Sequence, residues 1–347
     1  MTDTRLELEL REQPEALERL IREQGATAKE LGALLRRRDV RYLLIASRGS
    51  SSNVARYAQY LLGRANRVPV AFATPSLYTL YGQPPRLDGA LVVGISQSGE
   101  SPDVNAVIAD ARAQGRPTVA LTNVPTSPLG STADEVLALE AGVEESVAAT
   151  KTYVNSLGAI ALLFATSTGD EGALAELERV PRQLAHQLER SREAAGQIDG
   201  LGPVEGGTVI ARGVNYGTSF EIALKIRELS GLLFEAYSAA DLMHGPVAAI
   251  APGWPVIAVA PSGPALWSVE EALQNVSARG ARPIVIADDE RVLRRGEVRL
   301  PLESGVPEWL SPLLAVVPGQ FVALRLSQLR GIDVDRPLGL SKVTLTR

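Results

Sequence analysis

GISQSGES, at residues 94–101, is the most informative stretch of this chain of 347 residues. It follows the apolar run Leu91–Val93 and precedes a helical pattern at Pro102–Gln114, so it predicts a tight turn from a strand into a helix. Such a turn offers hydroxyls and backbone N–H groups to an anion, and the helix N-terminus adds a favourable dipole. It lacks the lysine of a GxxxxGKS/T loop, which disfavours a nucleoside triphosphate. A single phosphate on a small molecule fits better.

The region around this turn has a second copy later in the chain. Three segments in one half match three in the other, in the same order and at a spacing of roughly half the chain. This agreement predicts duplication of a whole domain and not a short solenoid repeat. The matched pairs are YLLIASRG (42–49) with GTVIARG (207–213), LVVGISQSG (91–99) with PVIAVAPSG (255–263), and AQGRPTVALTN (113–123) with RGARPIVIADD (279–289).

Each copy alternates short apolar runs with longer amphipathic segments. Apolar runs that do not alternate with polar residues, when helices separate them, indicate a parallel sheet covered on both faces. We therefore predict an α/β fold of two tandem, doubly wound, flavodoxin-like parallel-sheet domains related by duplication. Ligands of such sheets bind at the carboxyl ends of the strands, where both Ser/Gly turns fall. The predicted strands are 42–46, 68–73, 90–95, 118–122 and 135–139, then 208–211, 233–237, 256–260, 283–287 and 297–301.

The remaining segments connect and cap these domains. We predict an N-terminal helical segment, a first domain that binds phosphate, a helical connector, a second domain that carries the catalytic groups, and a tail that closes the site. The tail has no helical period after Pro337. The predicted boundaries are 1–37, 38–170, 171–199, 200–332 and 333–347.

Composition excludes several classes of function. The net charge is −5 and no block of basic residues occurs, which disfavours nucleic acid as a partner. No apolar run of membrane-spanning length is evident and the N-terminus is acidic, so we expect a cytoplasmic protein without membrane contact. The absence of cysteine excludes disulfides, thiolate metal sites and cysteine nucleophiles. The two histidines lie far apart in sequence, so we expect no metal and no other cofactor.

Two charged side chains on the predicted helix Ser219–Gly231 suggest acid–base chemistry. Lys225 lies one turn before Glu228, so both face the same side of the helix. The spacing alone favours a surface ion pair, and the alternative is a general base oriented by an ammonium group. His244 precedes Gly245-Pro246, where an imidazole either carries a proton or caps the following turn.

Six motifs resemble the sugar isomerase (SIS) family. More narrowly, they resemble the isomerase half of glucosamine-6-phosphate synthase and the stand-alone SIS-type amino-sugar-phosphate deaminases and isomerases. The resemblance covers nearly the whole chain from about residue 40 onward, and the motifs follow the family's order. They are GSSSN (49–53), SQSGES (96–101), SVAATK (146–151), ALKIRELS (223–230), HGP (244–246) and DVDRPLGLSK (333–342).

The resemblance implies a role for each matching residue. By this resemblance, Glu228 is expected to be the base, with Lys225 as its partner, and Lys342 to contact the open-chain sugar near C1 and C2. His244 is expected to reach the site of the neighbouring subunit, which implies a homodimer. The implied phosphate ligands are Ser50, Ser51, Ser96, Gln97, Ser98 and Ser101. The implied sugar-binding residues are Gly49, Glu144, Val147 and Ala148.

One site for each subunit is expected. The corresponding turn of the second copy, Ala260–Gly263, contains Pro261 and is no longer rich in serine. We therefore do not expect this turn to bind phosphate. The first domain would then supply the phosphate site and the second the catalytic groups.

Three functions remain open at this stage. The first is an amino-sugar-phosphate deaminase/isomerase that converts glucosamine 6-phosphate to fructose 6-phosphate and ammonia through an enediol or enolamine. No glutaminase activity is expected, because the synthase uses a cysteine nucleophile for it. The second is another phosphosugar aldose–ketose isomerase or a deglycase. The third is a sugar-phosphate sensor without catalysis.

Overall fold

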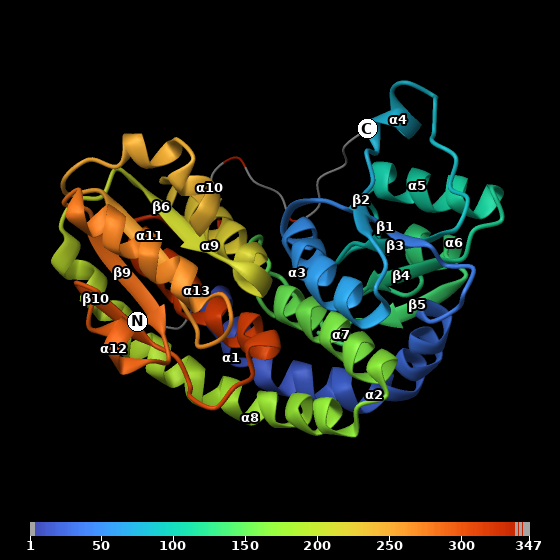
Figure 1. Ribbon diagram of the computed structural model, residues 1–347, viewed down its shortest axis with the longest axis horizontal. Coiled ribbons are helices and arrows are strands. Elements are labelled where there is room, and N and C mark those ends of the chain that lie inside the picture. Colours follow the sequence, from blue (N-terminus) through green and yellow to red (C-terminus); the bar gives the residue numbers. More distant parts are fainter. Residues whose placement is uncertain (1–3, 337–338, 340–341, 343–347) are drawn as a thin grey trace. The chain divides into compact units, whose positions relative to one another are not determined.

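The computed structural model of the chain describes residues 4–336, 339 and 342, and contains two compact units (Figure 1). Of the described residues, the first-domain unit contains Glu12–Glu145, Ala149–Arg179 and Lys342. The second-domain unit contains 4–11, Ser146–Ala148, 180–336 and 339. Both units are discontinuous in sequence, and the five boundaries given above stay predictions.

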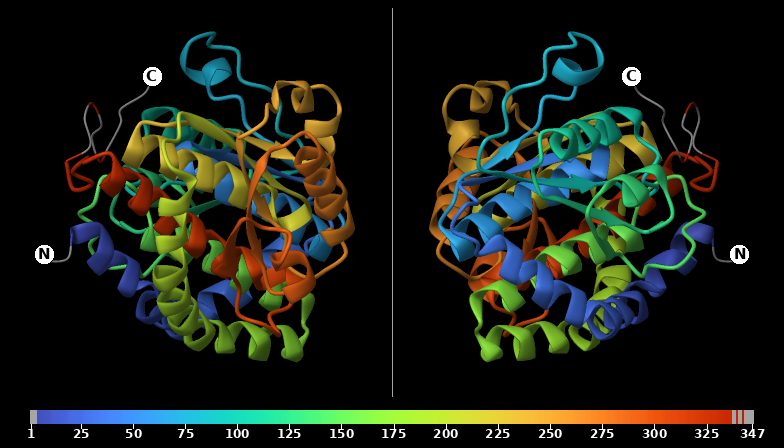
Figure 2. Two further views of the ribbon diagram at one scale, coloured as in Figure 1. Left: turned by 90° about the vertical axis from the view of Figure 1, so that its left-hand side faces the viewer. Right: turned by 90° about the vertical axis from the view of Figure 1, so that its right-hand side faces the viewer.

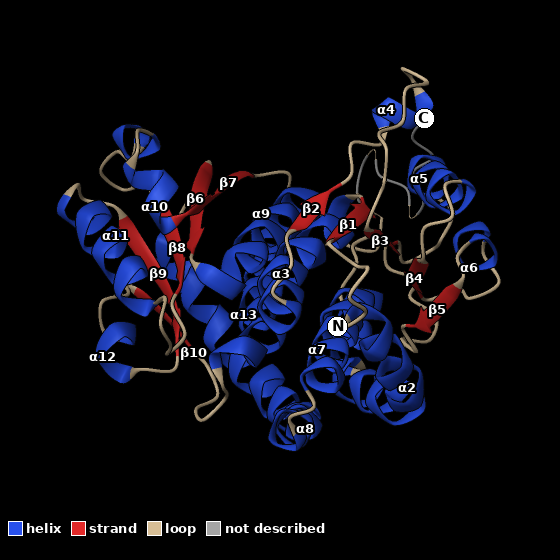
Figure 3. Cartoon of the chain, turned by 45° about the vertical axis from the view of Figure 1, so that its right-hand side comes forward, coloured by secondary structure: helices blue, strands red, loops and turns tan. Residues whose placement is uncertain are grey.

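The first-domain unit is built on a wholly parallel, five-stranded sheet. Its strands are β1 (Tyr42–Ser47), β2 (Val70–Phe72), β3 (Ala90–Ile95), β4 (Thr118–Thr122) and β5 (Glu135–Ala138). Its helices include α2 (Gln13–Leu35), α3 (Gly49–Asn66), α4 (Ser76–Thr79), α5 (Pro102–Ala113), α6 (Pro128–Thr132) and α7 (Lys151–Thr168). The strand order is β2-β1-β3-β4-β5, and every residue of β3 and β4 is buried. This burial is what continuous apolar runs dictate, because helices α5 and α6 cover one face and α3 and α7 the other (Figure 3).

A glycine in β3 allows its covering helices to approach closely. A Cβ atom at Gly94 would lie 2.8 Å from Leu129 Cδ1 and 3.0 Å from Ile108 Cγ1. These side chains come from α6 and α5, so the glycine lets both helices pack directly on the strand. The packing fixes the position of the turn that follows β3.

The second-domain unit repeats this architecture. Its strands are β6 (Gly206–Ala211), β7 (Leu233–Ser238), β8 (Pro255–Val259), β9 (Arg282–Ala287) and β10 (Val298–Pro301). Its helices include α1 (Arg5–Arg11), α9 (Tyr216–Ser230), α10 (Ala239–Met243), α11 (Leu266–Ala278), α12 (Glu290–Leu293) and α13 (Ser311–Leu329), while α8 (Glu171–Ala194) is divided between the units. The strand order is β10-β9-β8-β6-β7, all parallel. Helices α11 and α12 lie on one face of this sheet and α9 on the other (Figure 3; further views in Figure 2).

The two sheets confirm the predicted fold and its duplication. Numbered from the first strand of each copy, both orders are 2-1-3-4-5. The matched Arg-Gly pairs have the same conformation: Gly49 follows β1 with φ +53° and Gly213 follows β6 with φ +63°. A left-handed φ strains any residue with a Cβ, so the repeated glycine reflects the same turn in both copies. Each predicted strand is present, with ends that differ by at most two residues.

One apolar segment corrects an expectation from composition. Among the described residues, the helical stretch Glu308–Leu329 is long and apolar enough to cross a membrane by length and composition. However, 94% of its apolar window is buried inside the structure. Its side chains pack on α9, where a Cβ at Gly319 would collide with Ile222. The apolar composition of this helix is therefore explained by its place in the core of the second-domain unit.

Candidate functional site

The turn after β3 is held in shape by its own hydroxyl groups. Ser96 Oγ accepts a hydrogen bond from the N–H of Gly99 at 3.1 Å, and Ser98 Oγ accepts one from the N–H of Glu100 at 3.3 Å. Gly99 has φ +68°, and a Cβ there would collide with Ser127. The conformation of the turn therefore depends on both its glycine and its serines. Ser101 is the N-cap residue of α5, but its side chain makes no capping hydrogen bond to that helix.

The structure brings the six predicted phosphate ligands to one edge of the first sheet. Ser47 at the end of β1 is paired with Ile95 at the end of β3, so the turns after these two strands are neighbours. Ser50 and Ser51 lie in the first turn of α3, which begins without a side-chain cap. We name the set Ser50, Ser51, Ser96, Gln97, Ser98 and Ser101 the serine cradle. Two helix N-termini and several hydroxyls at one sheet edge suit a dianionic phosphate. The phosphate role itself stays a prediction.

An ion pair that the sequence did not reveal joins the two turns of the serine cradle. Arg48 Nε lies 2.5 Å from Asp103 Oδ2, which joins the start of α3 to the first turn of α5. The Asp103 side chain is 1% exposed, whereas that of Arg48 is 51% exposed. The guanidinium group therefore neutralises a buried acid beside the predicted anion site and fixes the separation of the two turns.

Replacing Arg48 by methionine is expected to destabilise the chain by about 1–3 kcal/mol, because Asp103 would lose a buried hydrogen-bond partner. Arg37→Met is the matched control, because Arg37 and Asp39 form a pair that is exposed on both sides, and such pairs contribute roughly 0–1 kcal/mol. Urea unfolding of the two variants measures the difference. Equal midpoints for both would contradict a structural role for the Arg48–Asp103 pair.

The corresponding turn of the second copy is filled by the protein's own carboxylates. The N–H of Ser262 donates to Asp288 Oδ1 at 2.7 Å, and the N–H of Ala265 donates to Glu308 Oε1 at 3.4 Å. Gly263 lies so close to Glu308 that a Cβ there would be 2.6 Å from its Cγ. These acids occupy the donors that an anion would need, which supports the expectation that this turn does not bind phosphate.

Helix α9 carries a cluster of three charged residues, of which two are buried and one is partly exposed. Lys225 is 1% exposed and contacts the carboxylates of both Glu221 and Glu228. Its Nζ lies 3.4 Å from Glu221 Oε1. The Glu221 side chain is fully buried and that of Glu228 is 25% exposed. The interpretation of Lys225 and Glu228 as a surface ion pair is therefore wrong, because α13 and the sheet enclose this helix.

Glu221 is a functional candidate that the sequence reasoning missed. Its spacing of four residues from Lys225 is as suitable for contact on one helix face as the spacing of three between Lys225 and Glu228. Glu228 is the only member of the cluster with substantial exposure. Lys225, itself held by Glu221, therefore fixes the orientation of a carboxylate that can reach a small molecule.

His244 follows α10 and is exposed. Its backbone N–H donates to Asp241 O at 3.1 Å, while Ser238 caps the helix through the N–H of Asp241. The turn that follows, Pro246–Ala249, begins after Gly245 without a side-chain cap, so the imidazole does not cap it. Its predicted contact with a neighbouring subunit stays a prediction.

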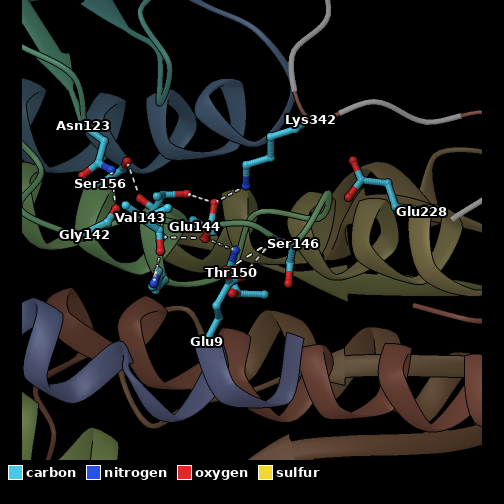
Figure 4. Close-up of polar contacts among 12 residues, drawn as sticks. Glu9, Asn123, Gly142, Val143, Glu144, Ser146, Thr150, Ser156, Glu228 and Lys342 are labelled. Atoms are coloured by element: carbon cyan, nitrogen blue, oxygen red, sulfur yellow. Dashed lines mark hydrogen bonds and ion pairs between the residues drawn. The ribbon is translucent and has the colours of Figure 1, made fainter. Parts of the chain in front are cut away.

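The predicted sugar-binding residues fall in three places. Gly49 begins α3 beside the serine cradle. Val147 and Ala148 belong to the second-domain unit, where the N–H of Ser146 donates to Glu9. Glu144 belongs to the first-domain unit, and Figure 4 shows its carboxylate facing Lys342, whose Nζ lies 2.6 Å from Glu144 Oε2. The sugar contacts of all four residues stay predictions.

Comparisons with known proteins identify the family of the two domains. The SIS domain model matches the chain twice, at residues 34–166 and 208–326. The glutamine–fructose-6-phosphate aminotransferase (isomerizing) of Pyrococcus horikoshii is 34% identical over 344 residues, which cover 96% of this chain and 56% of that protein. The chain spans about half the length of the curated relatives it matches.

Solved structures show the same fold. The C-terminal domain of glucosamine-fructose-6-phosphate aminotransferase from Francisella tularensis superposes with a TM-score of 0.84 at 27% identity, covering 97% of this chain and 99% of that one. Glucosamine-6-phosphate deaminase from Thermotoga maritima superposes with a TM-score of 0.80 at 21% identity, covering 99% and 100%. The latter likeness shows the fold alone. Two matched domains across most of its length show that this chain belongs to the SIS family of phosphosugar isomerases.

Proposed function

We propose that this chain converts an amino-sugar 6-phosphate to a ketose 6-phosphate and ammonia, with glucosamine 6-phosphate as the substrate and fructose 6-phosphate as the product. The observation that carries the proposal is the partly exposed Glu228, oriented by the buried Lys225. The serine cradle supports it, because its hydroxyls and helix N-termini suit one phosphate.

The proposed reaction needs one base and one water molecule. His244 assists ring opening by moving the proton between the ring oxygen and the C1 hydroxyl. Glu228 then removes the proton from C2 while O1 takes up a proton, which gives an enolamine. Glu228 returns its proton to C1 as the amino nitrogen loses one. Lys225 orients the carboxylate throughout, and the Lys342 ammonium stabilises negative charge that develops on the substrate oxygen. The resulting imine at C2 takes up water and releases ammonia, so that substrate plus water gives ketose phosphate plus ammonia.

A panel of 6-phosphosugars and 6-phospho amino sugars tests the proposal when ammonia and ketose are assayed separately. We expect both products from glucosamine 6-phosphate. Ketose formation from a neutral aldose phosphate without any ammonia from amino sugars would instead indicate a simple isomerase. Tight binding of a phosphosugar without turnover would indicate a sensor. Either result contradicts the deaminase proposal.

We also propose that the chain works as a homodimer in which His244 serves the partner's site. Glu228→Gln and His244→Ala would each be inactive alone. Mixed, refolded dimers would regain about a quarter of the wild-type sites, because half of the dimers are mixed and each of these has one intact site. Activity measured after mixing checks this prediction, and no recovery in a mixture shown to contain mixed dimers would contradict it.

A further inference from the structure

Lysine is rare in this chain, and its positions are informative. Only four of the 35 basic residues are lysines. Lys29 is exposed on α2. The other three, Lys151, Lys225 and Lys342, each contact a carboxylate. The lysine ammonium group is a compact point charge, whereas the arginine guanidinium group is wide and planar. At these three positions a compact ammonium group therefore pairs with a specific carboxylate.

The carboxylate that faces Lys342 is fully enclosed by donors. The Glu144 side chain is fully buried. Its Oε1 accepts from the N–H of Thr150 at 2.9 Å and from the N–H of Thr152 at 3.1 Å. Its Oε2 accepts from Thr152 Oγ1 at 2.7 Å and from Lys342 Nζ at 2.6 Å. A carboxylate has about four acceptor positions, so these contacts use all of them.

Three of the four donors to Glu144 come from the start of α7. The first N–H groups of a helix favour a negative charge, so this acid is held in place without help from Lys342. The loop before it is also fixed, because Asn123 Nδ2 donates to Gly142 O at 2.7 Å and Lys151 Nζ donates to Val143 O. Figure 4 shows Glu144 between this loop and Lys342. The acid is thus a preformed acceptor for the Lys342 ammonium group.

We propose that Glu144 is a positioning residue that seats the ammonium group of Lys342, and that its carboxylate does not bind the sugar hydroxyls directly. A sugar hydroxyl would have to displace Lys342 or Thr152 to reach either carboxylate oxygen. The catalytic consequence rests on the proposed function, in which Lys342 contacts the open-chain sugar. The seating itself rests only on the contacts described above.

Chemical labelling tests the seating without any assay of activity. The full chain is treated with a limiting amount of an acetylating reagent, and mass spectrometry gives the labelling of Lys342 relative to Lys29 in the same sample. Glu144→Gln is expected to raise this ratio about threefold, because the neutral amide holds the ammonium group less strongly. Glu145→Gln, the exposed acid next in sequence, is the matched control and is expected to leave the ratio unchanged. An unchanged ratio in Glu144→Gln would overturn the proposal.

A second variant guards against misfolding, because Glu144 also serves the N-terminus of α7. Glu144→Asp keeps a negative charge near the helix N-terminus, but its side chain is one methylene shorter and its carboxylate lies farther from Lys342. The same rise in labelling is therefore expected. Thr152→Val removes one hydroxyl donor to Glu144 and keeps the carboxylate. It is expected to lower stability without raising the ratio. A rise equal to that of Glu144→Gln would show that general loosening, and not seating, controls the reactivity of Lys342.

A double-mutant cycle tests the catalytic consequence. We compare Glu144→Gln, Lys342→Met and the double variant, with kcat and KM measured separately. If Glu144 acts through Lys342, the double variant has the same kcat as Lys342→Met, within about twofold. Additive losses, or a higher KM for Glu144→Gln in the Lys342→Met background, would show a direct sugar contact and overturn the proposal. A wild-type chain that turns over none of the panel would refute the proposed function, while the labelling result would still decide the seating.

Discussion

Replacing Glu228 by glutamine is expected to lower kcat by about three orders of magnitude, because an amide of the same shape cannot accept the proton from carbon. Folding is expected to be unaffected, because the amide oxygen can still accept from Lys225 and the side chain is partly exposed. Steady-state kinetics measure the loss, and urea unfolding checks the fold.

The control for this variant is Glu271→Gln, which changes an exposed acid on α11 of the same unit. It is expected to retain wild-type kcat. A Glu228→Gln chain that keeps more than about a tenth of wild-type activity would remove Glu228 from the role of base.

Replacing Lys225 by methionine is expected to destabilise the second-domain unit by about 3–5 kcal/mol, since it leaves the fully buried Glu221 without its counter-charge. That loss is a large part of the roughly 5–15 kcal/mol that stabilises an ordinary domain. Chemical denaturation, followed by two independent probes, measures the change.

A compensating variant separates charge from packing. Lys225→Met combined with Glu221→Gln is expected to recover most of the lost stability, because the fully buried charge that Lys225 balances is then gone. Lys29→Met, at an exposed lysine, is expected to change stability by no more than about 0.5 kcal/mol. A loss in Lys225→Met as small as that of Lys29→Met would contradict the buried pairing of Lys225 with Glu221.

The hydrophobic pattern of the sequence predicts the fold, because the burial of each strand is reflected in the residues of that strand itself. The strand at Thr118–Thr122 was predicted with its observed ends, since a buried parallel strand requires an uninterrupted apolar run. The duplicated Arg-Gly turns could also be predicted from the sequence. A left-handed φ favours glycine, so both turns have glycine at the same position.

The candidate site was only partly predictable because burial depends on distant segments. The spacing of Lys225 and Glu228 is typical of a surface ion pair. Lys225 is buried because α13 packs on α9, and the local sequence of α9 does not predict that packing. The partners Arg48 and Asp103 are separated by 55 positions, and Glu144 and Lys342 by 198. Contacts between residues so far apart in sequence depend on the order of the strands in the sheet and on the path of the chain. The hydrophobic periodicity of the sequence predicts neither.

In the proposed reaction, Glu228 takes a proton from C2 of a sugar phosphate. The most direct measurement follows the C2 hydrogen of glucosamine 6-phosphate by NMR in D2O, with ammonia assayed in parallel. The wild-type chain is predicted to lose this hydrogen from C2 as ammonia forms, and Glu228→Gln is predicted to keep it. Ammonia released by the wild-type chain with the hydrogen still on C2, or equal loss of the hydrogen in both proteins, would show that Glu228 is not the base.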